Sequence, residues 1–60
     1  MNIAHLRKNA GITQEELAEK LNIDRSAVAK WETGQALPKA ERLSQIAKTL
    51  NCTIDELLNG

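Results

Sequence analysis

One face of a predicted helix over residues 24–33 carries the side chains best suited to bind a charged ligand. At about 100° per residue, Ala27, Val28 and Trp31 point inward. The positions that point outward or flank this face supply two cations, two hydroxyls, one methyl group and no acid: Arg25, Ser26, Ala29, Lys30 and Thr33. Such groups can donate hydrogen bonds to phosphates and to base edges. An ordinary solvated surface is the alternative, although such surfaces usually mix charges of both signs.

Six of the eight acidic residues are predicted to lie on other helices, so that a neutral chain can still present one non-acidic face. Eight Lys and Arg residues balance eight Asp and Glu residues, and the formal net charge is zero. This removes the simplest argument for nucleic-acid binding, which is a strongly basic chain. The acids fall on the outer sides of the second, fourth and fifth predicted helices: Glu15, Glu16, Glu19, Glu41, Asp55 and Glu56.

The elements that position this face are predicted to be five short helices without strands. Apolar residues recur at helical spacing along the whole chain, and no stretch alternates with period two. Sixty residues suffice for one domain, so we expect a single all-α domain over residues 1–60. Its first helix has Ile3, Leu6 and Ala10 on the apolar stripe, and Gly11 is expected to end that helix in a left-handed conformation.

Short capping motifs predict where most of the other helices begin. Thr13 with Glu16, and Thr53 with Glu56, form two T-x-x-E capping boxes. Asp24 is expected to cap the third helix. The buried face of the second helix is expected to be formed by Leu17, Ala18 and Leu21. The apolar residues of the fourth helix are Leu43, Ile46, Ala47 and Leu50, and those of the fifth are Ile54, Leu57 and Leu58.

The third and fourth helices are separated by the longest irregular stretch. Gly34 is expected to stop the third helix, and Pro38 suits the first turn of the fourth. The start of that fourth helix is poorly capped, because Lys39 and Ala40 are not N-cap residues.

The second and third helices form a candidate helix-turn-helix over about residues 14–33. Only Asn22 and Ile23 join them, and so short a link holds two helices at a steep angle. Asn22 tolerates a positive φ, and Ala18 is small enough for a close helix crossing. An ordinary corner of a small helical bundle would show the same spacing.

Two charged residues lie on apolar stripes and are natural partners for each other. Arg7 lies beside Leu6 on the first helix, and Glu32 lies beside Trp31 on the third. A charge that faces the core needs a partner. We therefore predict a structural, non-catalytic ion pair between Arg7 and Glu32.

The chain resembles the phage Cro and repressor type of helix-turn-helix protein, also called the XRE family. The resemblance covers Leu6 to Leu58, and its motifs identify the family only in combination, not one by one. The residues that carry it are Thr13-Gln14-Glu15-Glu16-Leu17-Ala18, Leu21-Asn22-Ile23, Val28, Trp31-Glu32-Thr33-Gly34 and Leu57-Leu58. It implies a five-helix DNA-binding domain that acts as a dimer on a pseudo-palindromic operator, with the third helix in the major groove.

The resemblance also implies roles for individual residues. Base-reading positions correspond to Arg25, Ser26 and Lys30, with Ala29 against a thymine methyl group. Phosphate-contacting positions correspond to Thr13, Gln14, Thr33 and Gln35, and the ion pair corresponds to Arg7 and Glu32. The family often has Gly at Asn22, and Ser at Lys39, where this chain offers a further cation for phosphate.

Other residues with chemical potential are better explained by structure. His5 has no second metal ligand nearby, and Cys52 suits a small buried site. Trp31 shares its stripe with Val28, which favours core packing over stacking on a base. Leu57 and Leu58 are adjacent, so one is expected to cover the core and the other to be a candidate dimer contact.

The sequence thus predicts a sequence-specific regulator that binds double-stranded DNA, a repressor by steric occlusion, acting as a homodimer. The rival is a protein-interaction module, such as an antitoxin or another partner-binding regulator on the same scaffold. No catalytic, metal or cofactor motif is assembled, so we expect no enzyme. The chain shows no secretory signal or membrane span, and one cysteine cannot form an internal disulfide, so we expect a cytoplasmic protein. Gly60 leaves open whether the natural chain continues.

Overall fold

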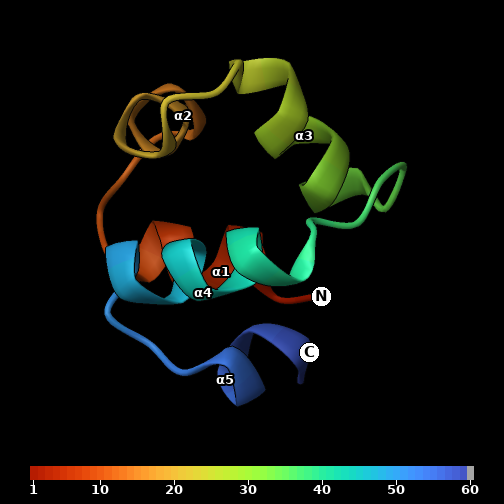
Figure 1. Ribbon diagram of the computed structural model, residues 1–60. Helices are drawn as coiled ribbons and strands as arrows, with labels where there is room; N and C mark the ends of the chain where they lie inside the picture. Colours follow the sequence, from red (N-terminus) through yellow and green to blue (C-terminus); the bar gives the residue numbers. More distant parts are fainter. Residues whose placement is uncertain (60) are drawn as a thin grey trace.

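Five α-helices and no strand make up the part of the chain that the computed structural model describes, residues 1–59 (Figure 1). The all-α prediction is therefore confirmed, whereas Gly60, where the predicted domain ends, lies outside the described residues. The helices are α1 (Ile3–Asn9), α2 (Gln14–Leu21), α3 (Arg25–Thr33), α4 (Ala40–Thr49) and α5 (Ile54–Leu58).

The helices are arranged in three levels, which leaves one side of α3 open to solvent (Figure 1). The pair α2 and α3 lies at one end, α1 and α4 lie in the middle, and α5 lies at the opposite end. The amide of Asn2 donates a hydrogen bond of 2.8 Å to the carbonyl of Leu57, which ties the start of the chain to α5.

A single apolar core joins all five helices. Its most deeply buried large side chains are Ile3, Leu17, Val28, Ile46 and Leu57. Each such side chain stabilises the fold by about 1.5–3 kcal/mol relative to an exposed position. The remaining core residues are Ala18, Leu21, Trp31, Ala47 and Leu50, so Trp31 belongs to the core as predicted.

Both predicted capping boxes are present. In the first, the Thr13 amide donates to Glu16 Oε1 at 2.9 Å, and the Glu16 amide donates to Thr13 Oγ1 at 3.0 Å. These bonds, followed by a weaker attraction to Lys20, outweigh slight desolvation and lower the pKa of Glu16. In the second box, Thr53 and Glu56 make the same exchange at 2.9 and 3.1 Å.

The turns also follow the sequence prediction. Gly11 and Gly34 have φ values of 73° and 83°, and Asn22, which ends α2, has a φ of 59°. These are left-handed conformations, which Gly adopts without penalty and Asn more readily than most residues. Asn51, after α4, has a φ of 56°, which the sequence analysis did not anticipate.

Three local predictions were wrong. Ala10 is exposed because α1 ends at Asn9, so that Ala10 lies after the stripe has ended. Asp24 occupies the N-cap position of α3, yet its side chain makes no capping hydrogen bond within the described residues. Pro38 lies outside α4, because Lys39 is extended and acts as the N-cap residue. Lys39 makes no side-chain cap, in keeping with the poorly capped start expected there.

Candidate nucleic-acid interface

The α2–α3 corner is a tight helix-turn-helix. Asn22 takes the left-handed conformation, and the amide of Ile23 then donates to the carbonyl of Ala18 at 3.0 Å. Ala18 is only 3% exposed, as expected of a small residue at a close helix crossing. Three residues, 22–24, separate the two helices, one more than the link predicted from the sequence.

The exposed side of α3 presents the predicted base-reading residues together. Arg25, Ser26 and Lys30 are exposed, and Ala29 is half-buried beside them. Val28 is 0% exposed and anchors the opposite side of the helix in the core. None of the three polar side chains is enclosed within the fold, so they are available to a ligand.

The Arg7–Glu32 ion pair is present and fastens α3 to α1. Arg7 Nε donates to Glu32 Oε2 at 2.6 Å, and Arg7 Nη2 donates to Glu32 Oε1 at 3.2 Å. The side chains are only 10% and 8% exposed, respectively. Arg7 Nη1 also donates to the carbonyl of Ile12 at 2.8 Å, so one guanidinium joins α1, the α1–α2 link and α3.

Gln14 extends this network to α2. Its Nε2 donates to Glu32 Oε1 at 2.9 Å. Burial raises the pKa of Glu32, but hydrogen bonds from Arg7 and Gln14, with the positive charges of Arg7 and Lys8, outweigh it and lower that pKa overall. The pKa of Arg7 is raised, chiefly by its hydrogen bond to Glu32, so both members of the pair are held in their charged forms.

The predicted phosphate-contacting residues lie on two sides of α3. Thr13 and Gln14 share a shallow depression with Arg25. Thr13 Oγ1 accepts the Glu16 amide, which leaves its hydroxyl hydrogen available to a ligand. Lys39 lies elsewhere, on a groove lined by Ala27 and other residues on the inner flank of α3.

The other two predicted phosphate-contacting residues, Thr33 and Gln35, come shortly after Lys30 in the sequence. Thr33 and Gln35 are exposed, at the end of α3 and just after it. The Thr33 hydroxyl donates to the carbonyl of Lys30 at 3.3 Å, and the amide of Gln35 donates to the same carbonyl at 3.0 Å. The Thr33 proton is thus engaged within the helix, while the Gln35 side chain is exposed.

Two features of the surroundings were missed by the sequence analysis. Glu15 lines the depression that contains Arg25, so one carboxylate borders the face that was expected to have acids only elsewhere. Arg42 of α4 donates to the carbonyl of Leu21, at the end of α2. No pattern in the sequence indicates an acceptor that is a backbone atom of another helix.

The two leucines of α5, Leu57 and Leu58, differ in how deeply they are buried. Leu57 is 0% exposed and its side chain fills the core, so it is the leucine that covers the core and is not available as a dimer contact. Leu58 is 53% exposed, which keeps it as the candidate contact. His5 is exposed, and Cys52 is half-buried, where desolvation and then the charge of Glu56 raise the pKa of its thiol.

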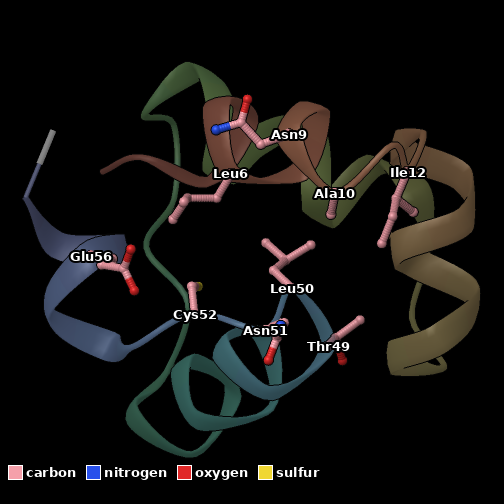
Figure 2. Close-up of a pocket in the computed structure, with 9 residues that line it drawn as sticks. All are labelled: Leu6, Asn9, Ala10, Ile12, Thr49, Leu50, Asn51, Cys52 and Glu56. Atoms are coloured by element: carbon pink, nitrogen blue, oxygen red, sulfur yellow. The ribbon is translucent and has the colours of Figure 1, made fainter.

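A groove of about 490 Å³ lies between α1 and the α4–α5 turn, away from the base-reading residues. Figure 2 shows Leu6 and Ala10 of the α1 side facing Leu50 and Cys52 across it.

Across residues 1–59, no three His, Cys, Asp or Glu side chains are grouped closely enough to hold a metal ion. Over the same residues, no helix has the length and apolar character required to cross a membrane.

Comparison with known proteins decides the family. A helix-turn-helix family model matches residues 3–57. The chain belongs to the helix-turn-helix family. The matched residues include both α2 and α3. No solved structure gave a significant match.

Several helix-turn-helix relatives are transcriptional regulators by name. The chain is 47% identical over 58 residues to the HTH-type transcriptional activator BcrR of Enterococcus faecalis, covering 97% of this chain and 28% of the relative. It is 38% identical to the cryptic phage CTXphi transcriptional repressor RstR of Vibrio cholerae, covering 92% and 49%. It is 36% identical to the HTH-type transcriptional regulator DicA of Escherichia coli, covering 97% and 43%. The chain thus spans half or less of the length of these relatives.

Proposed function

We propose that the chain is the DNA-binding domain of a transcriptional regulator and reads double-stranded DNA through α3 in the major groove. The observation that carries this proposal is the exposed position of Arg25, Ser26 and Lys30 on one side of a helix whose other side is anchored in the core. A helix of this size fits the major groove, where base pairs present distinct hydrogen-bond patterns.

Within this proposal, the residues divide into two groups. Arg25, Ser26 and Lys30 contact base edges, and the half-buried methyl group of Ala29 contacts a thymine methyl. The phosphate contacts come from both sides of α3 and fix its register on the duplex. They are Thr13, Gln14, Gln35, Lys39 and Thr33, whose hydroxyl exchanges its bond to the Lys30 carbonyl for one to phosphate.

The names of the relatives are compatible with activation and with repression of transcription, since BcrR is called an activator and RstR a repressor. We propose repression by steric occlusion for this chain, which the name of its relative RstR, a transcriptional repressor, supports. We also propose a homodimer that places two copies of α3 about 34 Å apart, one turn of DNA. Leu58 is the candidate contact between the copies. The named relatives come from bacteria and phages, where DNA lies in the cytoplasm, and we propose the same location here.

Selection of bound duplexes from random oligonucleotides tests the proposal directly. The expected result is an enriched pair of inverted half-sites. With such a duplex, Lys30→Ala is expected to relax base preference at one position and cost about 1–3 kcal/mol of discrimination. Lys48→Ala removes the same charge from an exposed site on α4 and serves as the matched control.

Three outcomes would count against parts of the proposal. A uniform loss of affinity across all operator variants would show that Lys30 contacts phosphate rather than a base. No enriched sequence, combined with capture of a co-encoded protein, would favour the protein-interaction module. An affinity that does not change with salt concentration would argue against DNA binding altogether, because each phosphate contact contributes about −0.9 to the slope of log K against log salt concentration.

A further inference from the structure

Arg42 joins α4 to the end of α2 through its guanidinium. It is half-buried near the start of α4. Its Nη1 donates to the carbonyl of Leu21 at 3.2 Å and to Oε1 of Gln45 at 2.8 Å. The Gln45 amide oxygen, one turn along α4, holds the guanidinium in place while it reaches across to α2.

The acceptor is a carbonyl that the helix itself leaves unsatisfied. The last carbonyls of an α-helix have no partner within the helix. At this end, the amides of Asn22 and Ile23 donate to Glu19 and Ala18, so they do not serve Leu21. Leu21 is only 7% exposed, which limits access of water. Arg42 therefore supplies a charge-assisted hydrogen bond and a positive charge at the negative end of the α2 dipole.

The same side chain borders the inner flank of α3. Arg42 lines a groove with Ile23 of the turn and with Ala27 and Trp31 of α3. It thus bonds to the end of α2 and shares a groove with the turn and with α3. Arg25 and Lys30 are exposed and do not line this groove, so Arg42 belongs to the support behind the exposed face.

We infer that Arg42 is a positioning residue for DNA reading, which holds the α2–α3 turn in the geometry that presents α3 to the groove. The inference rests on the proposed function. A regulator whose binding-competent geometry is only partly populated shows an apparent affinity reduced by that fraction. Without the bond to Leu21, the turn gains freedom, and we expect an affinity loss of about three- to tenfold, the range of one hydrogen bond.

The test compares Arg42→Met with Lys48→Met in the intact chain. Methionine keeps an unbranched apolar stem against the groove and removes the donor. Lys48 is an exposed cation on the same helix, so its variant controls for the lost charge. Affinity for the selected duplex is measured at a temperature where denaturant titration shows each variant fully folded. Amide hydrogen exchange at Asn22 and Ile23 reports on the turn without DNA.

The expected result is threefold or greater weakening for Arg42→Met, an unchanged salt slope, and faster exchange at Asn22 and Ile23. Lys48→Met should leave the affinity within about twofold and the exchange unchanged. Equal affinity of folded Arg42→Met and the wild-type chain would overturn the inference and reduce Arg42 to a stabilising contact. A slope that falls by about 0.9 would overturn it differently, by showing a direct phosphate contact. Failure of the wild-type chain to select any duplex would instead refute the proposed function itself.

Discussion

The Arg7–Glu32 pair is expected to contribute a large share of the stability of this small domain. Glu32 accepts three hydrogen bonds, two from Arg7 and one from Gln14, in a site where both charged side chains are at most 10% exposed. Removal of one member of a buried pair costs about 3–5 kcal/mol, because the other charge is left uncompensated. The low end applies here, since the pair retains some contact with water.

That loss is severe on the scale of the whole domain. At about 0.05–0.15 kcal/mol per residue, 60 residues correspond to a total stability of about 3–9 kcal/mol. We therefore expect Glu32→Leu to lower the free energy of unfolding by about 3 kcal/mol and Tm by at least about 12 °C. Leucine has a similar size and no acceptor, so it isolates the loss of the carboxylate.

A double-mutant cycle with urea unfolding separates the pair from its surroundings. Arg7→Met and Glu32→Leu each leave one charge unpaired, whereas the double variant leaves none. The loss of stability in the double variant should therefore be smaller than the sum of the two single losses, by about 2 kcal/mol or more. Glu19→Leu, at an exposed position of α2, is the control and should change stability by no more than about 0.5 kcal/mol. Single losses below about 1 kcal/mol, or strictly additive losses, would refute this account.

Three further predictions follow from the burial and hydrogen bonding of single side chains. The pKa of Glu32 is lower in the folded chain than its ordinary value of 4.5, so the stability it confers is present above that value and is lost as pH falls through the folded value. Acid titration of circular dichroism should show this, with a smaller loss in Glu32→Gln; equal losses would contradict it. Thr13→Ala should cost about 1 kcal/mol in urea unfolding by removing the cap of α2, and no change would show that the box is dispensable. Leu57→Ala should cost about 2–5 kcal/mol, whereas Leu58→Ser should spare stability and weaken self-association in analytical ultracentrifugation; unchanged self-association would remove Leu58 as the contact.

The parts of the fold that sequence predicted are those determined by neighbouring residues. Capping boxes act over three residues, and a left-handed turn depends on one residue, so Thr13, Thr53, Gly11 and Asn22 could be assigned locally. The Arg7 pairing was also accessible, because a charge on an apolar stripe demands a partner and few candidates exist.

The errors occur where the type of a residue does not decide what its backbone or side chain does. Pro38 was assigned to α4, but the extended backbone of Lys39 delays the helix by two residues. Asp24 has the right type and position for a cap, yet backbone bonding alone starts α3. The partner of Arg42 lies 21 residues earlier and is a main-chain carbonyl, which no residue pattern encodes. Only the three-dimensional arrangement reveals it.

The distribution of charge, under the proposed function, favours selective over indiscriminate DNA binding. Non-specific binding depends almost entirely on net electrostatic attraction to phosphates. A chain of zero net charge, with Glu15 at the edge of its interface, attracts an arbitrary duplex weakly. Hydrogen bonds from Arg25 and Lys30 to matched bases form only after α3 is docked, so they add to specific affinity without raising the non-specific background. Selectivity then depends on how rigidly α3 is held, which is the task of Glu32 at one end of the motif and of Arg42 at the other.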